Sequence, residues 1–421
     1  MQVVPGHDTK QQAEPNAVEP EGEMVIDLFK NYDRKVPHIT KYMGSKRNIL
    51  DFVIESINEN YNGGTICDLF AGTSILSGAL GKLVPMHSND VQEYSAVLSK
   101  TYLSNYDWSQ FSATLLEDIL NEASNHVTNF REQYSDLTYT YSAEMTIKQF
   151  VQLEKKQQRL LEYNFGDSTH HLFVKYYSGT YWSFEQCLWI DALRRVADDY
   201  RESPMYYVIL SSLMYSMSYC SQSTGHYAQY RDATSESSKN DILIYRLRTI
   251  KPYFESKFNQ LKEHLGSNNL EHTVTSLDYR ECLDILETGT LVYADPPYAF
   301  VHYSRFYHAI ETLVKYDYPE VDHKGRYRSD RHQSPFGRRT EVQEAFKSLF
   351  EKIKEKQSCL ILSYSNTGMI TLEQIIGIAN EVLENEYEVT YREADHKHST
   401  MGRSDDKSKD VKEYLVIAKL R

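Results

Sequence analysis

The stretch best suited to chemistry is residues 291–298, with the sequence Leu-Val-Tyr-Ala-Asp-Pro-Pro-Tyr. Its apolar first half predicts a buried strand. Pro296 and Pro297 stop strand pairing, because each fixes φ and lacks a backbone donor. We expect a rigid turn that holds the Asp295 carboxylate, the Pro296 carbonyl and the Tyr298 ring at fixed separation. Such a turn suits binding of a planar base through its exocyclic amine. The alternative is a strand-ending turn with an incidental Asp295.

A strand–turn–helix unit lies in the first quarter of the chain. Residues 65–70 predict a short strand, and the turn Ala-Gly-Thr-Ser leads into a predicted helix over 75–82. Gly72 in this turn lets the backbone approach a ligand without an intervening Cβ. A second predicted strand over 83–87 ends near Asp90. That carboxylate could bind both ribose hydroxyls of a nucleoside, or could cap the next helix.

Two further segments place polar groups beside predicted elements. The sequence Lys-Tyr-Met-Gly-Ser-Lys at 41–46 precedes a helix that we expect to reach about Asn60. Gly44 and Lys46 would put free backbone N–H groups and a cation where an anion could bind. Asp278 follows a predicted strand and could accept a hydrogen bond from an adenine amine, or could cap the next helix.

Between these groups of motifs the α/β pattern lapses. The interval from Thr101 to Ser238 predicts mostly helix, at 111–126, 145–163, 183–200 and 205–219. Aromatic residues interleaved with Gln, Arg and His in the connections suit nucleic-acid contact, and equally suit ordinary packing. A helical insertion of this size in an α/β enzyme favours a domain that determines specificity.

The α/β pattern then resumes. It predicts a helix over 242–266, a strand at 272–276, a helix over 341–355, and strands at 359–364, 387–391 and 414–419. After Tyr298 we expect a loop of about forty residues, which is long for a structureless segment. Across 301–340, eight Lys and Arg face five Asp and Glu. This surplus predicts a DNA-backbone contact surface, with a solvated flap as the alternative. The candidates are Tyr303, Arg326, Arg328, Arg331 and Arg338.

Composition narrows the class of protein. The net charge of the 421 residues is −13, which argues against nonspecific coating of nucleic acid but not against a local basic groove. The five scattered cysteines show no zinc-site spacing, which favours a reduced cytosolic protein without a structural metal. Residues 1–23 predict a disordered tail, not a signal peptide, and no apolar run is long enough to span a bilayer.

The order of the motifs resembles that of one family. The segments 41–46 and 68–73, a long insertion, and then 295–298 are similar to those of D12-class (α-group, Dam-like) N6-adenine DNA methyltransferases. The similarity covers roughly 37–100 and 240–421, and it implies a Rossmann-like α/β sheet with a mostly helical inserted target-recognition domain. The predicted organisation is a tail (1–23), a first catalytic segment (24–100), the insertion (101–240) and a second catalytic segment (241–421).

The resemblance also implies a cofactor and a site, with no metal. S-adenosyl-L-methionine would be bound by Tyr42, Gly44, Lys46, Asp68, Phe70, Ala71, Gly72, Thr73, Asp90 and Asp278. Asp295, Pro296, Pro297 and Tyr298 would be catalytic. The Asp295 carboxylate and the Pro296 carbonyl would accept the two N6 hydrogens, and Tyr298 would stack on an adenine flipped out of the duplex. Where the family usually has a second glycine in the turn, this chain has Ser74.

The expected activity is site-specific methylation of adenine N6 in double-stranded DNA, in restriction–modification or in phage or host DNA marking. The expected location is the cytoplasm, for a protein encoded by a bacterium, an archaeon or a phage. A cognate restriction endonuclease is left open as a partner. The alternatives are an RNA adenine-N6 methyltransferase and a noncatalytic DNA-binding protein on the same scaffold. N4-cytosine methylation ranks lower, because Ser usually replaces Asp295 there. A nicotinamide dehydrogenase would need a GxGxxG turn, which is missing from residues 71–76.

Overall fold

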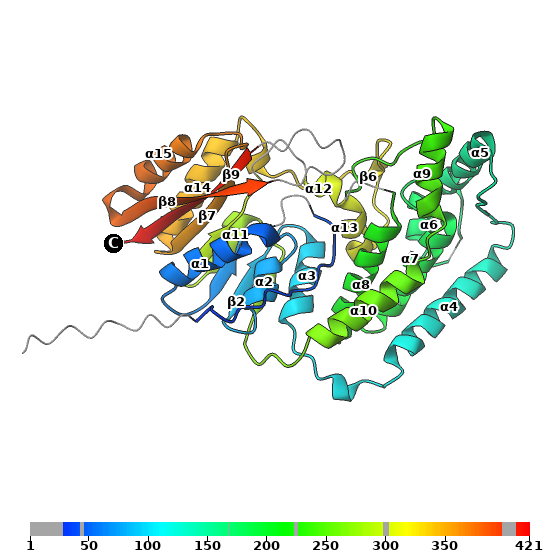
Figure 1. The fold of residues 1–421 in the computed structure, drawn as a ribbon, viewed down its shortest axis with the longest axis horizontal. Helices are drawn as coiled ribbons and strands as arrows, with labels where there is room; N and C mark the ends of the chain where they lie inside the picture. Colours follow the sequence, from blue (N-terminus) through cyan, green and yellow to red (C-terminus); the bar gives the residue numbers. More distant parts are fainter. Residues whose placement is uncertain (1–27, 43–45, 167, 223–225, 298–302, 398–409) are drawn as a thin grey trace, which may run out of the picture.

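The computed structural model of the protein describes residues 28–42, 46–166, 168–222, 226–297, 303–397 and 410–421. It has an α/β region, built on one large sheet, beside a lobe made almost entirely of helices (Figure 1). Among the described helices, none is both long enough and apolar enough to cross a membrane. The predicted tail (1–23), Gly44 and Tyr298 lie outside the described residues.

A seven-stranded sheet forms the centre of the α/β region, in the order β3-β2-β1-β4-β7-β9-β8. The first five strands in this order are parallel, and β9 runs antiparallel to both of its neighbours. The strands are β1 (Ile66–Asp68), β2 (Met86–Asn89), β3 (Thr273–Thr275), β4 (Leu291–Ala294), β7 (Cys359–Ser365), β8 (Tyr387–Lys397) and β9 (Asp410–Leu420). This mostly parallel sheet confirms the predicted Rossmann-like α/β class.

Helices cover both faces of the sheet, so successive strand residues enter different cores. Ile66 packs in the core that contains the helices α1 (Leu50–Asn60), α2 (Ile75–Leu80) and α3 (Glu93–Leu103). Its neighbour Cys67 packs in the opposite core, with α11 (Tyr279–Ile285), α14 (Val342–Glu355) and α15 (Leu372–Leu383). Burial on both faces explains why the short strands β1, β2 and β4 are buried at every position.

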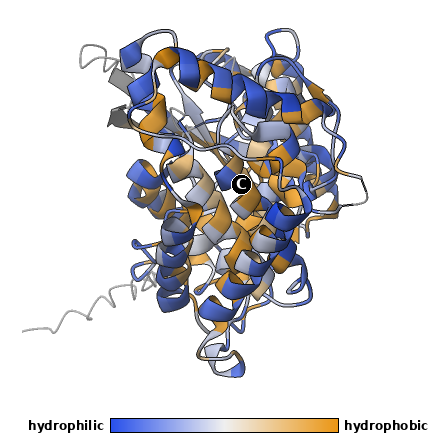
Figure 2. Ribbon diagram, turned by 90° about the vertical axis from the view of Figure 1, so that its right-hand side faces the viewer, coloured by the Kyte–Doolittle hydropathy of each residue, from blue (hydrophilic) through white to orange (hydrophobic). Residues whose placement is uncertain are grey.

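The helical lobe contains α4 to α10 together with α12 and α13. Its helices carry hydrophobic residues on some sides and hydrophilic residues on others (Figure 2), as expected when one side of each faces a core. The helices are α4 (Leu115–Gln133), α5 (Ile147–Gln158), α6 (Leu172–Tyr177), α7 (Phe184–Asp198), α8 (Met205–Cys220), α9 (Glu236–Arg246), α10 (Ile250–His264), α12 (Tyr303–Phe306) and α13 (His308–Lys315). The short 3-10 helices are η1 (Lys46–Ile49), η2 (Trp108–Gln110), η3 (Arg159–Glu162), η4 (Pro335–Gly337) and η5 (Glu384–Glu386).

The prediction of one helix over 242–266 was wrong. Two helices, α9 and α10, occupy this stretch, with a break between Arg246 and Ile250. Pro252 explains the break, because its ring would clash with the carbonyl of Arg248 if the helix continued through both residues. In the first turn of α10 the proline is tolerated, since its missing N–H would have no partner there.

The prediction of a loop of about forty residues after Tyr298 was also wrong for the described residues. This stretch forms α12, α13, a small hairpin of β5 (Val321–Asp322) and β6 (Tyr327–Arg328), and η4. Along α13, Ile310, Leu313 and Val314 recur at helical spacing and are buried. The prediction for this stretch rested on its surplus of basic residues and did not use the apolar periodicity.

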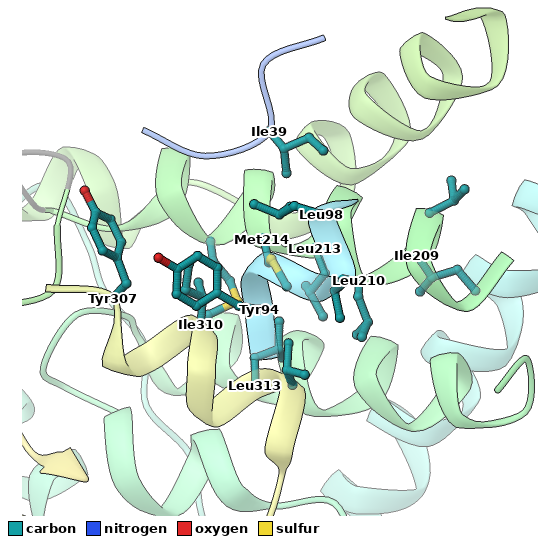
Figure 3. Close-up of a cluster of buried hydrophobic side chains, with 14 of the residues drawn as sticks. Ile39, Tyr94, Leu98, Ile209, Leu210, Leu213, Met214, Tyr307, Ile310 and Leu313 are labelled. Carbon is teal, nitrogen blue, oxygen red and sulfur yellow. The ribbon is translucent and has the colours of Figure 1, made fainter. Parts of the chain in front are cut away.

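The lobe and the sheet share a continuous core. Residues of α3 (Tyr94, Leu98) meet residues of α8 and of α13 (Ile310, Leu313) in one buried cluster (Figure 3). Since α10 also packs on α8, the lobe takes in chain on the C-terminal side of residue 240, where the predicted insertion ended. The lobe is therefore assembled from more than one stretch of the chain.

Candidate active site

The glycine turn connects β1 to α2 and lies against the end of β2. The backbone N–H of Ala71 donates to the carbonyl of Asn89 (2.8 Å), and the N–H of Gly72 donates to Oδ2 of Asp90 (3.0 Å). Gly72 has φ +52°, and a Cβ at this position would lie 3.3 Å from the hydroxyl oxygen of Tyr42. The turn thus requires glycine for its conformation and for the room it leaves beside the pocket.

Asn89 is a site residue to which the sequence analysis assigned no role. Its side-chain amide donates to the carbonyls of Leu69 (3.2 Å) and Leu277 (3.1 Å), and its side-chain oxygen accepts from the Leu277 N–H (3.1 Å). Asn89 is 1% exposed and holds three strand ends together at the carboxyl edge of the sheet. Its position at the end of a predicted strand was the available signal.

Ser74, where the family usually has glycine, adopts the left-handed conformation with φ +57°. This conformation is strained for a residue with a Cβ. The Ser74 hydroxyl forms hydrogen bonds with the hydroxyl of Ser99 (2.7 Å) and with the carbonyl of Ser95 (3.2 Å), both on α3. These bonds anchor the turn to α3.

The glycine turn and the Asp295 corner open into the same pocket. Strands β1 and β4 are adjacent and parallel, and the N–H of Leu69 donates to the carbonyl of Tyr293 (2.9 Å), so the two loops leave the sheet side by side. The pocket is lined by the predicted site residues Tyr42, Lys46, Asp68, Phe70, Ala71, Gly72, Thr73, Asp90, Asp278, Asp295, Pro296, Pro297 and Tyr303. The sequence motifs, more than 200 residues apart, are one site in the structure.

Asp295 sits in a buried ionic cluster. The ammonium of Lys46 lies 3.1 Å from Oδ1 of Asp295 and 3.2 Å from Oε2 of Glu413. Burial, opposed by the charge of Lys46 and reinforced by that of Glu413, raises the pKa of Asp295 to about 6. Glu413 was missed by the sequence analysis. Its signal was a single acid in β9, at the alternating positions that also carry Leu415 and Ile417.

The polar lining of the pocket is strongly acidic. Burial and the nearby Asp295 and Asp90 carboxylates raise the pKa of Asp68 well above its usual value. Burial also raises the pKa of Asp90, although the N–H groups of Gln92 and Gly72 oppose the shift. Carboxylates that crowd one desolvated space favour a cationic ligand. S-adenosylmethionine carries a sulfonium and an ammonium group, so these residues fit it.

Asp278 and Phe70 are both part of the pocket lining. The Asp278 carboxylate caps α11 by accepting from the N–H of Arg280 (3.1 Å), as one of its two predicted roles required. The ring of Phe70 packs edge-on against Phe336 of η4, at 5.5 Å between centroids. Residues 332–335 and 337 line the pocket as well. A segment predicted to contact DNA thus contributes to the wall beside the glycine turn.

A stack of tyrosines forms another wall. The ring of Tyr42 is stacked on Tyr307 at 4.5 Å between centroids, and on Tyr303 at 5.7 Å. Tyr303, predicted to contact DNA, is thereby included in the pocket lining. The stack joins the segment before η1 to α12 and α13.

Two of the arginines predicted to contact DNA are buried and engaged within the protein. Arg326 donates to the carbonyls of Tyr176 and Gln158. Arg328 is 2% exposed and is held by Asp317 and Asp330. Their positions do not support a direct contact with a DNA backbone, because donors already satisfied in the protein interior are not available to phosphates.

The other two arginines are more accessible. Arg331 is partly buried, with its guanidinium 5.4 Å from the centroid of the Tyr327 ring. Arg338 is 39% exposed and binds Glu341 (2.7 Å) and Gln333 (2.7 Å). The Arg338 side chain is therefore partly exposed, although its guanidinium binds two side chains of the protein.

Fold and pocket define a class. A mostly parallel sheet that brings a glycine turn and an Asp-Pro-Pro corner to one acidic pocket is the arrangement of a Rossmann-like methyltransferase. A family model of the D12 class N6 adenine-specific DNA methyltransferases matches residues 42–361, and the chain belongs to this family. The family prediction is confirmed.

Curated relatives agree with this assignment. The chain is 24% identical over 361 residues to Modification methylase LlaI of Lactococcus lactis subsp. lactis, covering 82% of this chain and 51% of the relative. It is 25% identical over 373 residues to Type II methyltransferase M.FokI of Planomicrobium okeanokoites (85% and 50%). It is 20% identical over 346 residues to Type II methyltransferase M.NlaIII of Neisseria lactamica (79% and 86%). The chain spans about half the length of the first two relatives.

Proposed function

We propose that this protein transfers a methyl group from S-adenosylmethionine to N6 of a flipped-out adenine, within a specific sequence of duplex DNA. The observation that carries the proposal is that Asp295 and the Gly72 turn share one pocket. The names of the relatives, modification methylases and type II methyltransferases from bacteria, support a role in bacterial restriction–modification. A cytoplasmic location and a cognate endonuclease belong to the same proposal.

The residues divide the work by position. Phe70, Ala71, Thr73 and Asp278 would hold the nucleoside moiety of the donor, and Asp90 its ribose hydroxyls. Bound S-adenosylmethionine supplies an electrophilic methyl group on a sulfonium and leaves as the neutral thioether. Asp295 and the Pro296 carbonyl would accept the two N6 hydrogens and aim the nitrogen lone pair at that methyl group.

The proton balance suits Asp295. As the N–C bond forms and the C–S bond breaks, N6 becomes cationic and must lose one proton. A carboxylate with a pKa of about 6 is a sufficient base for an alkylated aromatic ammonium, and it can pass the proton to solvent. Asp295 must therefore be ionised when substrate binds.

Two neighbouring cations, Lys41 and Arg248, support a polyanionic substrate. Lys41 directly precedes the pocket residue Tyr42, and its ammonium lies 4.5 Å from the ring centroid of Tyr219. Arg248 donates to the carbonyl of Tyr219. Burial and then the charge of Arg248 lower the pKa of Lys41. Among the described residues, Lys41 contacts an aromatic ring and Arg248 a backbone carbonyl, and neither forms a salt bridge with an acid. Both cations could therefore bind phosphate groups.

Removing Lys41 tests this surface. Each phosphate contact contributes about one unit to the slope of log Kd against log salt. We expect Lys41→Ala to weaken DNA binding and to reduce that slope by about one unit in a fluorescence anisotropy titration. Lys352→Ala is the control, because Lys352 is bound to Asp284 and Glu355 on the far side of the sheet. An unchanged slope for Lys41→Ala would remove Lys41 from the DNA surface.

Methyl transfer itself tests the proposed function. Expression in a host without N6-methyladenine, followed by sequencing that detects this base, should show methylation at every copy of one short DNA sequence. Purified protein should methylate duplex DNA that carries this sequence and leave RNA of the same sequence unmodified. Methylation of RNA alone would instead identify an RNA adenine methyltransferase. Binding of S-adenosylmethionine without transfer to either substrate would refute the proposal.

A further inference from the structure

Glu413 occupies an unusual position for an acid. It lies in β9, a strand with neighbours on both sides, and it is 1% exposed. Its side chain shares a strand face with Leu415 and Ile417, which belong to the core beneath α1. Burying a carboxylate in such a place is costly unless a partner compensates. The partner is Lys46, at the start of η1.

The geometry distinguishes the two carboxylates that contact Lys46. The ammonium donates a hydrogen bond to Oε2 of Glu413 (3.2 Å). It lies equally close to Oδ1 of Asp295 (3.1 Å), but this is an ion pair, and Oδ1 accepts no well-aligned hydrogen bond from the described residues. The Lys46 ammonium thus lies next to Asp295 as a positive charge, while it donates a hydrogen bond to Glu413.

We propose that Glu413 is a positioning residue, which holds the Lys46 ammonium out of line with Asp295 and so keeps Oδ1 open for a hydrogen of the adenine amine. The inference rests on the proposed function and names a further residue of the same site. Without Glu413, the ammonium would turn to Asp295, the nearest remaining carboxylate, and occupy the acceptor that the substrate needs.

The effect on Asp295 has a defined sign. Among the described residues, the charged and titratable groups that face Asp295 are Lys46 from η1, Glu413 from β9, Asp68 from β1, Tyr293 from β4 and Tyr303 from α12. The charge of Glu413 raises the pKa of Asp295, and the charge of Lys46 lowers it. Replacing Glu413 by Gln removes the repulsion and weakens the hydrogen bond from Lys46, because an amide oxygen is a weaker acceptor than a carboxylate, so Lys46 binds Asp295 more strongly. Both changes lower the pKa of Asp295.

The test is the pH profile of Glu413→Gln. We expect kcat to fall by up to about 100-fold, because a misdirected group beside the reacting amine costs about this much. The KM for S-adenosylmethionine should stay near that of the wild type, and the acid limb of the profile should move to lower pH. A fall in kcat without movement of the limb would indicate a merely structural role and overturn the inference. An unchanged kcat would overturn it too.

Two further variants separate the effect from misfolding. Glu393→Gln makes the same change on the neighbouring strand β8, where Glu393 is exposed and bound to Lys412, and it should leave kcat and the pH profile unchanged. In Lys46→Met/Glu413→Gln, loss of Glu413 should add no further decrease in kcat to that of Lys46→Met, because Glu413 acts through Lys46. Additive losses would contradict the inference.

A measurement without substrate distinguishes this inference from the proposed function. The ¹³C resonance of the Asp295 carboxyl, assigned by its absence in Asp295→Asn, reports the pKa directly. We expect this pKa to be lower in Glu413→Gln than in the wild type. If methyl transfer failed but the pKa moved, the proposed function would be wrong and the coupling of Glu413 to Asp295 would hold. An unmoved pKa would refute the coupling even in an active enzyme.

Discussion

Two buried cations in this protein each bind two carboxylates, with opposite consequences. In the lobe, Arg328 donates four hydrogen bonds to Asp317 and Asp330. In the pocket, Lys46 lies between Asp295 and Glu413. The hydrogen bonds from Arg328 lower the pKa of both lobe carboxyls, whereas burial raises the pKa of Asp295 to about 6.

Solvation accounts for the difference. The Asp317 and Asp330 side chains are 45% and 56% exposed, so only the cation has been desolvated. The Asp295 and Glu413 side chains are 18% and 1% exposed, and one ammonium cannot compensate for both. One cation and two carboxylates therefore form a stabilising ion-pair cluster around Arg328. Around Lys46 the same combination leaves Asp295 with a raised pKa.

The largest expected difference is in catalysis. Asp295→Asn should reduce kcat by about 1000-fold, since the amide would present a donor or a weaker acceptor to the N6 hydrogens. Binding of S-adenosylmethionine, measured by calorimetry, should persist. Asp317→Asn makes the same change in the lobe cluster and should leave kcat within about twofold, because Asp317 is not part of the pocket lining. Equal losses in both variants would refute the comparison.

The next difference is in pH dependence. Because the ionised form of Asp295 is the active one, kcat/KM should fall about tenfold per pH unit as the pH drops below about 6. The lobe cluster should not respond in this range. Its carboxyls have depressed pKa values when folded, so its stabilising contribution is complete above the unfolded pKa of about 4. It is lost only as the pH falls further. A flat activity profile from pH 5 to 7.5 would contradict the assignment.

Stability should show the reverse ranking. Arg328→Gln should lower the free energy of unfolding by about 2 kcal/mol, the order expected for lost hydrogen bonds to charged groups. Urea denaturation followed by circular dichroism provides the measurement. Asp295→Asn should leave the free energy of unfolding unchanged or raise it, because an amide is less costly to bury than a carboxylate. A larger loss for Asp295→Asn than for Arg328→Gln would reverse the comparison.

The smallest expected effect is the release of a fraction of a proton when S-adenosylmethionine binds. A cationic ligand lowers the pKa of nearby carboxyls, so binding of S-adenosylmethionine near pH 6 should release protons from Asp295 and Asp68. Calorimetry in phosphate and in imidazole, which differ in ionisation enthalpy, would measure the release. It should decrease in Asp295→Asn and persist in Asp317→Asn. Binding enthalpies that do not depend on the buffer would contradict the acidic character of the pocket.

Local patterns predicted much of the fold. Strand–turn–helix punctuation identified the β1 turn, and consecutive prolines identified the end of β4. The errors came where two local signals competed. For α13, the prediction followed the charge content of the segment and not its apolar periodicity. Over 242–266, it followed the long helical pattern and not the break that Pro252 imposes. In both cases the secondary structure followed the less conspicuous signal, which was the apolar periodicity in α13 and the proline in 242–266.

Long-range contacts account for what the sequence analysis missed in the site. Asn89 and Glu413 look ordinary in the chain, and their roles arise because β2 and β9 bring them to other strand ends and to Lys46. Conversely, Arg326 and Arg328 resemble phosphate contacts in sequence, yet burial and internal partners occupy them. Burial and partner identity depend on residues far apart in the chain.

The sequence by itself determined the family, the α/β class and the two motifs that carry the chemistry, because glycine and proline constrain the backbone locally and side-chain types are fixed. Only the tertiary structure decided which charges stay reactive. The pKa of a carboxyl and the availability of a cation depend on solvent exposure and on neighbours brought together by folding, and no local pattern encodes these.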